Sequence, residues 1–123
     1  MFDCNELKEI NDAYGHDKGD LYLKTACRLI CRVFQHSPVF RIGGDEFAVV
    51  LQNDDFKNRE ALIGQFEREK AEISASVENR WEEPRVAIGI AVYDPEVDGS
   101  ISDTMRRADK NMYDNKRIGK ESK

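Results

Sequence analysis

Apolar and polar residues alternate in short runs along this chain, and the runs change between the period of a strand and the period of a helix. Two apolar runs, at 39–40 and 47–51, flank a segment with two adjacent glycines, which predicts a β-hairpin. A further strand is predicted over 85–93, where Val or Ile at every second position alternates with Ala87, Gly89 and Ala91. Those small residues predict that another element packs closely against one face of the strand.

Helical periodicity is predicted over 20–35, 57–79 and 102–117, with Gly119 as the expected stop of the last helix. Residues 3–19 are polar and rich in glycine, so we expect only a short helical turn and a loop there. We expect Asp17 or Asp20 to cap or charge the start of the first helix, and 53–55 to break the strand before the second. The inward positions are predicted to be Leu23, Ala26, Cys27, Ile30 and Phe34, then Leu62, Phe66, Ile73 and Val77, and finally Met105, Ala108 and Met112.

This order of strands and helices predicts an α+β fold, an α/β layer in which helices cover a sheet. The 123 residues are enough for one domain with a core. Met1 and Phe2 are interpreted as the end of an apolar strand. No repeat or linker divides the chain.

Composition narrows the possible functions. Charged residues make up 35% and apolar residues 40% of the chain, and no apolar run is long enough to span a bilayer. The formal net charge of −5 argues against nucleic-acid binding, although a metal ion and local lysines could still hold a nucleotide. Three cysteines, Cys4, Cys27 and Cys31, form no disulfide framework by count or spacing, so we expect reduced thiols and a cytoplasmic location.

The predicted hairpin carries candidate chemistry at its tip. Asp45 and Glu46 follow Gly43 and Gly44, so two carboxylates stand beside a bare backbone that a bulky anion could approach. Carboxylates are ligands that Mg²⁺ prefers, and Asp3 at a strand end could join them if the two strands are neighbours. An ordinary surface turn and an ordinary strand-end acid are the alternatives.

Three separated motifs resemble those of the GGDEF family, the diguanylate cyclase domains. Residues 41–47 resemble its signature, and residues 3–12 with Gly15-His16 and Gly19-Asp20 are similar to its amino-terminal signature. Residues 107–113, with Lys116 and Lys120, are similar to its last helix. The resemblance extends from Phe2 to about Lys120 and implies a palm-like nucleotidyl cyclase fold.

The family's reaction is the condensation of two GTP molecules into cyclic di-GMP with release of pyrophosphate, assisted by Mg²⁺ or Mn²⁺. The resemblance implies that the active form is a homodimer, because each site holds one GTP. It also implies that residues 1–123 are one domain that lacks its N-terminal helices and most of its first strand. An upstream sensory or regulatory domain is expected in the full-length protein, which could be anchored to a membrane.

The resemblance assigns roles to individual residues. Asp45 matches the general base and a metal ligand, Glu46 matches its neighbouring acid and metal ligand, and Lys8 matches a lysine that stabilises the transition state. Asp3 and the main-chain carbonyl of Cys4 match further metal ligands. The expected substrate contacts are Asn11 and Asp20 to guanine, His16, Gly43 and Gly44, and Lys116 and Lys120 to phosphate. Asn5 stands where the family has a second aspartate, and we expect little effect from it.

Guanine presents N1–H and N2–H donors that a carboxylate can accept, whereas adenine lacks this pair, so Asp20 should disfavour ATP. Two alternatives stay open: a regulatory domain that binds GTP without cyclising it, and an inert dimerisation module.

One family motif is absent. The Arg-x-x-Asp site that binds product in many members corresponds to residues 34–37, which contain neither arginine nor aspartate, so we predict no product inhibition.

Overall fold

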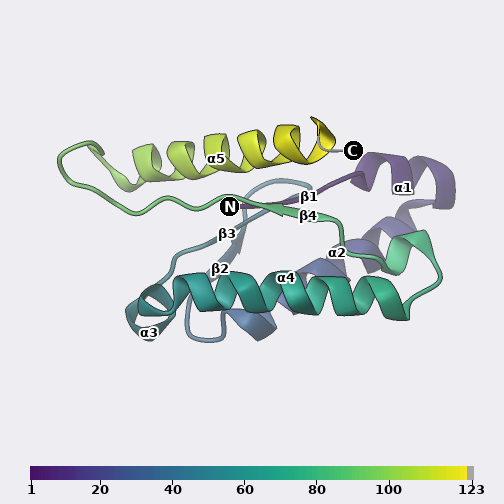
Figure 1. Cartoon of the computed structure of the whole chain (residues 1–123). Helices are drawn as coiled ribbons and strands as arrows, with labels where there is room; N and C mark the ends of the chain where they lie inside the picture. The colour runs from purple at the N-terminus through teal and green to yellow at the C-terminus, as the bar shows by residue number, and fades with distance from the viewer. Residues whose placement is uncertain (122–123) are drawn as a thin grey trace. The chain divides into compact units, whose positions relative to one another are not determined.

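The computed structural model describes the backbone of residues 1–121 and the side chains of residues 1–114. The chain divides into two compact units. The terminal unit contains Met1–Asp3 and Ala87–Lys123, and the central unit contains Cys4–Val86. Figure 1 labels the elements of both units, which are described separately below.

The predicted α+β class is confirmed, because the strands form one sheet that helices accompany (Figure 1). The strands are β1 (Phe2–Cys4), β2 (Val39–Arg41), β3 (Glu46–Val49) and β4 (Val86–Ile88), in the spatial order β2-β3-β1-β4. The first strand is thus an inner strand, and the division between the two units passes through β1 and β4.

The predicted hairpin is confirmed in the central unit. Strands β2 and β3 pair antiparallel, with Phe40 opposite Ala48. Phe47 and Ala48 are buried, whereas Phe40 on the edge strand is 53% exposed. Four residues, 42–45, connect the two strands, and neither Gly43 nor Gly44 has a positive φ.

Residues 3–19 are more helical than the sequence predicted. Helix α1 (Leu7–Tyr14) is followed directly by α2 (His16–Val33), and only Gly15, with φ 92°, separates them. A single residue in this left-handed region reverses the chain, so the polar residues 16–19 form the first turn of α2 rather than a loop. Asp17 lies in that first turn, as expected.

The buried face of α2 differs from the predicted one by a partial rotation. Ala26 and Ile30 are buried as predicted and Phe34 follows the helix in the core, whereas Leu23 and Cys27 are half-buried. Residues not predicted to face inward complete the buried set: Tyr22, Leu29 and Val33. Periodicity alone could not distinguish these adjacent stripes of the helix.

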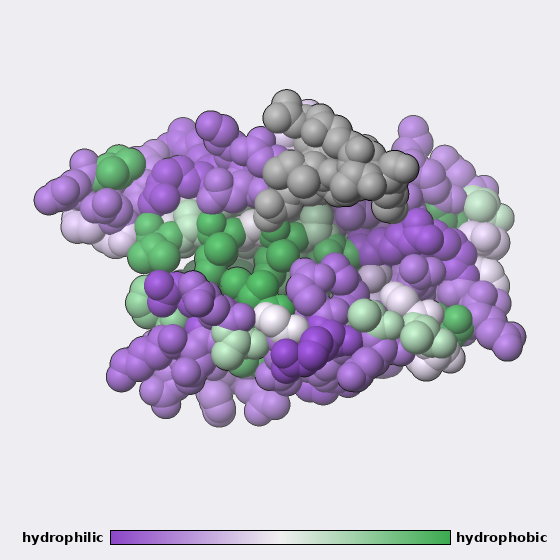
Figure 2. All heavy atoms as spheres, viewed as in Figure 1, coloured by the Kyte–Doolittle hydropathy of each residue, from purple (hydrophilic) through white to green (hydrophobic). Residues whose placement is uncertain are grey.

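The predicted second helix is interrupted. Residues expected to break the strand form α3 (Asn53–Lys57), and α4 (Arg59–Ser76) follows. The carboxylate of buried Asp55 accepts bonds from the His36 N–H (3.1 Å) and the Ser37 hydroxyl (2.7 Å), which anchors α3. Of the four predicted inward residues of α4 only Phe66 is buried, and Figure 2 shows mostly hydrophilic residues over this helix. A short 3₁₀ helix, η1 (Arg80–Glu82), leads to β4.

In the terminal unit, the strand predicted over 85–93 was wrong in length, since β4 ends at Ile88. Gly89 still exchanges two backbone hydrogen bonds with Met1, at 2.9 and 3.0 Å. Beyond Gly89, side chains of α5 (Ile101–Glu121) bind the main-chain oxygens of Ile90 and Val92 in place of a strand partner.

Close packing on the small-residue face of β4 is confirmed. A Cβ added to Gly89 would lie 2.3 Å from the Ala108 oxygen and the Met112 nitrogen, both backbone atoms of α5. Ala108 and Met112 are buried as predicted, with Thr104 also buried and Met105 half-buried. Gly119 is not the stop, because α5 continues to Glu121.

Candidate active site

Hydrogen bonds donated to main-chain oxygens within the hairpin hold the tip of β2–β3 in place. Ile42 N–H donates to the Glu46 oxygen (3.0 Å), and the Arg41 guanidinium donates to the oxygens of Gly43 (3.2 Å) and Gly44 (2.7 Å). A Cβ on Gly43 would come no closer than 3.9 Å to another residue, and one on Gly44 would meet nothing within 4 Å. The space over both glycines is therefore open to a ligand. Arg41 is a contributor that sequence reasoning missed.

Within the central unit the carboxylate pair lies next to the end of β1. Cys4 N–H donates to the main-chain oxygen of Asp45 at 2.8 Å. Cys4 is buried, whereas Asp45 and Glu46 are half-buried. The hairpin tip thus offers two carboxylates beside the backbone of Cys4, and these oxygens are donors of the type that Mg²⁺ prefers.

Asp3, the other predicted carboxylate ligand, belongs to the terminal unit, and its role stays a prediction. Among the described residues, no three His, Cys, Asp or Glu side chains gather closely enough to hold a metal ion. Within the described residues no disulfide joins the three cysteines, and Cys27 Sγ and Cys31 Sγ lie 4.0 Å apart on α2. Burial, followed by the neighbouring Cys27, raises the pKa of Cys31.

Four predicted site residues lie on the consecutive helices α1 and α2. Lys8 is exposed on α1, and His16 and Asp20 are exposed in the first two turns of α2. Asn11 is half-buried and its carboxamide lies against Gly19. Their roles in binding GTP stay predictions, and the side chains of Lys116 and Lys120 lie outside the described residues.

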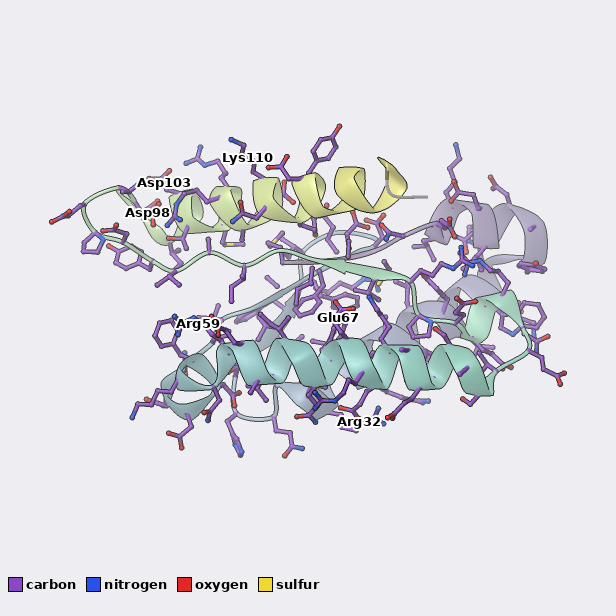
Figure 3. The ribbon with its side chains drawn as sticks, viewed as in Figure 1. Arg32, Arg59, Glu67, Asp98, Asp103 and Lys110 are labelled. Carbon is purple, nitrogen blue, oxygen red and sulfur yellow. The ribbon has the colours of Figure 1, made fainter. Side chains whose placement is uncertain are left out.

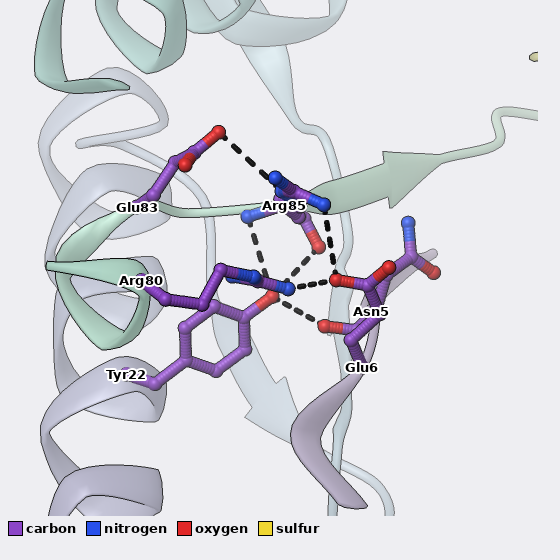
Figure 4. Close-up of polar contacts among 6 residues, drawn as sticks. All are labelled: Asn5, Glu6, Tyr22, Arg80, Glu83 and Arg85. Atoms are coloured by element: carbon purple, nitrogen blue, oxygen red, sulfur yellow. Dashed lines mark hydrogen bonds and ion pairs between the residues drawn. The ribbon is translucent and has the colours of Figure 1, made fainter. Parts of the chain in front are cut away.

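A buried hydroxyl fixes the segment between β1 and α1, and no pattern in the sequence indicated it. The Tyr22 hydroxyl contacts the main-chain oxygens of Asn5 (2.5 Å) and Arg85 (2.9 Å) and accepts a bond from the Arg85 N–H (3.3 Å), as Figure 4 shows. Glu6 forms ion pairs with Arg80 and Arg85 beside this hydroxyl. Burial and the neighbouring Arg85 lower the pKa of Arg80. These contacts join the two chain segments that enter and leave the central unit.

The terminal unit has its own buried anchor at the start of α5. The Asp98 carboxylate (labelled in Figure 3) accepts bonds from Thr104 Oγ1 (2.9 Å), the Asp94 N–H (3.0 Å) and the Arg107 guanidinium. Arg107 holds the pKa of Asp98 well below its usual range. The segment 94–98 is thereby fixed on α5.

The residues at the positions of the family's product-binding motif make contacts within the fold. Phe34 is 2% exposed and its ring lies 6.4 Å from that of Phe66, in the core. The Ser37 hydroxyl is bonded to Asp55. Neither side chain is presented as a ligand for guanine or phosphate, and the absence of product inhibition stays a prediction.

Comparisons with known proteins give consistent results. The model of the family described as "Diguanylate cyclase, GGDEF domain" matches residues 1–122. Diguanylate cyclase A of Treponema denticola is 29% identical over 121 residues, which are 98% of this chain and 32% of that protein. A diguanylate cyclase of Vibrio cholerae serotype O1 is 34% identical over 119 residues, 96% of this chain and 36% of that protein.

A solved structure supports the palm-like α+β assignment. The active GGEEF domain of a diguanylate cyclase from Vibrio cholerae matches with a TM-score of 0.77 at 32% identity, over 96% of this chain and 74% of that one. The chain spans about a third of the length of the curated relatives named above. Within the described residues, no helix has the length and apolar character needed to cross a bilayer.

Proposed function

Because this chain belongs to the GGDEF family, we propose that it is the catalytic domain of a diguanylate cyclase that converts two GTP into cyclic di-GMP and two pyrophosphates. In this reaction the 3′-oxygen of each GTP forms a bond to the α-phosphorus of the other. Each bond from α-phosphorus to pyrophosphate breaks, and each 3′-hydroxyl loses its proton. The protein must therefore orient two triphosphates, neutralise their charge and accept protons.

The observation that carries this proposal is the 2.8 Å backbone hydrogen bond between Cys4 and Asp45. It joins the end of an inner strand to a hairpin tip that bears two carboxylates and two glycines with open space above them. A triphosphate needs both features, since bare backbone admits its bulk and carboxylates can hold its counter-cation. Asp45 would accept the proton of a 3′-hydroxyl, and Lys8 would stabilise the charge that develops at phosphate.

A divalent cation fits the donor set of this site. The carboxylates of Asp45 and Glu46 and the main-chain oxygen of Cys4 would hold Mg²⁺ or Mn²⁺ in the central unit, whereas the proposed role of Asp3 rests on the family resemblance alone. When bound, such an ion supplies charge neutralisation to the triphosphate. The protein's own residues do the remaining work: Asn11 and Asp20 recognise guanine, His16 contacts the substrate, and Lys116 and Lys120 bind phosphate.

Two further parts of the proposal concern assembly. One chain provides one GTP site, so the condensation needs two copies whose sites face each other. The curated relatives are about three times longer than this chain, which leaves room for a regulatory domain in a full-length protein. We place the catalytic reaction in the cytoplasm, where GTP is available.

The test is synthesis of cyclic di-GMP from GTP and Mg²⁺ by the purified chain and by Asp45→Ala. Loss of a general base reduces rates by about 10²–10⁴, so product should fall by at least a hundredfold. Asp54→Ala is the matched control, because Asp54 is an exposed aspartate on α3 and should leave the rate unchanged. Unchanged synthesis by Asp45→Ala would refute the mechanism.

The same samples distinguish the alternatives. GTP binding by calorimetry without any turnover at high protein concentration would indicate a regulatory domain that binds but does not cyclise. Absence of a shift in melting temperature with either GTP or cyclic di-GMP would indicate an inert dimerisation module.

A further inference from the structure

Gly19 is a buried glycine within α2, and its position is determined by a side chain of α1. A Cβ at residue 19 would fall 1.7 Å from Asn11 Oδ1 and 2.8 Å from Asn11 Cγ. Real Cβ atoms do not come so close to other atoms, so the Asn11 carboxamide fills the space that any other residue at position 19 would need. Gly19 has an ordinary helical conformation and no positive φ, which leaves this contact as the reason for glycine.

We infer that Gly19 contributes to the guanine specificity of this site by seating the Asn11 carboxamide against α2, so that a bound base is held in the register in which the Asp20 carboxylate meets its N1–H and N2–H donors. The inference rests on the proposed function, in which Asn11 and Asp20 recognise the base. Asp20 follows Gly19 directly in α2, so a carboxamide seated on Gly19 is held next to the turn that carries the carboxylate. The glycine touches no ligand and acts as a positioning residue.

The physical gain is preorganisation. Because the carboxamide is held against the helix, Asn11 has little side-chain freedom left to lose when it binds a base. An alanine at position 19 would force the carboxamide away while leaving both of its polar atoms intact.

The structure also shows which variant removes the clash between a side chain at position 19 and Asn11. After Oδ1 and Cγ of Asn11, the next nearest atom to the added Cβ is Leu7 Cδ1, at 3.4 Å. The Asn11 Cβ therefore lies at least that far away, and Asn11→Ala removes the clash completely. In that background alanine at position 19 is well tolerated, and its higher helix propensity should stabilise α2.

The experiment is a double-mutant cycle of Gly19→Ala and Asn11→Ala in the 123-residue chain, with two readouts. We expect Gly19→Ala to lower the melting temperature in the parent and to raise it in Asn11→Ala, a reversal of sign. We also expect each single variant to lower the preference for GTP over ATP, measured by calorimetry, by about tenfold, and the double variant to lower it no further. Gly64→Ala is the control for a helical glycine, since its Cβ would meet only the Arg68 guanidinium at 3.8 Å. It should not change nucleotide preference.

Two results would overturn the inference. Independent, additive losses of selectivity would show that Gly19 does not act through Asn11, as would a Gly19→Ala variant with the parent's preference. If the parent itself does not distinguish GTP from ATP, the proposed guanine site fails and the role of Gly19 in specificity fails with it. The reversal in melting temperature would persist in that case, which separates failure of the proposed function from failure of the packing argument.

Discussion

Replacing Tyr22 by phenylalanine removes one oxygen atom from the central unit and tests how its two ends are held. The ring stays in the core, where Tyr22 is fully buried. The Arg85 N–H loses its acceptor and the Asn5 oxygen loses a donor, whereas the Arg85 oxygen keeps the bond from the Asn5 N–H at 2.8 Å. Leaving buried backbone groups without partners costs about 1–3 kcal/mol. For a chain of 123 residues each kcal/mol corresponds to about 4 °C, so the melting temperature should fall by about 4–12 °C.

Thermal unfolding followed by circular dichroism and urea titration would measure this change. The matched control is Tyr113→Phe, because that side chain is 65% exposed on α5 and its hydroxyl is accessible to water. Its melting temperature should shift by less than about 2 °C. Equal shifts for the two variants would refute the idea that the Tyr22 hydroxyl fixes the segment between β1 and α1.

Three further outcomes follow from particular contacts. Gly89→Ala should lower the free energy of unfolding by at least about 2 kcal/mol in urea titrations, because its Cβ would meet the backbone of α5. A change below about 0.5 kcal/mol would contradict this packing. Arg107 lowers the pKa of Asp98, so this carboxylate should stabilise the fold above pH of about 4 and lose that contribution as the pH falls through its lowered pKa. Asp98→Asn should therefore melt earlier at pH 7 and show a weaker acid dependence, whereas an unchanged pH profile would argue against the ion pair. Phe34 lies in the core and Ser37 is bonded to Asp55, so the initial rate of synthesis should stay constant as cyclic di-GMP reaches micromolar levels. Binding of cyclic di-GMP to the GTP-free protein, measured by calorimetry and retained in Asp45→Ala, would refute this prediction.

Features determined by neighbours in sequence could be predicted from the chain alone. The hairpin followed from apolar runs around two glycines, and the close approach of α5 to β4 followed from the small residues at 87–91. The predictions failed where distant partners decide the outcome. Strand β4 ends at Ile88, and beyond it side chains of α5 donate to the main-chain oxygens of Ile90 and Val92, contacts that no local pattern contains.

The same distinction explains why the contacts that support the site were missed. Tyr22 appears in the sequence as one apolar residue of an amphipathic helix, yet its hydroxyl contacts residues 17 and 63 positions away. Arg41 was visible only as the start of a motif, and its bonds to the glycine oxygens depend on the shape of a four-residue loop. The side chains of the motif could be predicted to carry chemistry, whereas the groups that orient them depend on the tertiary structure.

The boundary of α2 changes the interpretation of Asp20 in particular. With a helix beginning at residue 20, its carboxylate could be explained as a cap, because acids at the first turn satisfy free backbone N–H groups. In the structure α2 begins at His16, so residue 20 is the fifth residue of the helix and its backbone N–H lies in the regular ladder. Asp17 already supplies the acidic charge of the first turn. The exposed carboxylate of Asp20 is thus not needed to start the helix and is accessible to a ligand, and its role in binding guanine stays a prediction.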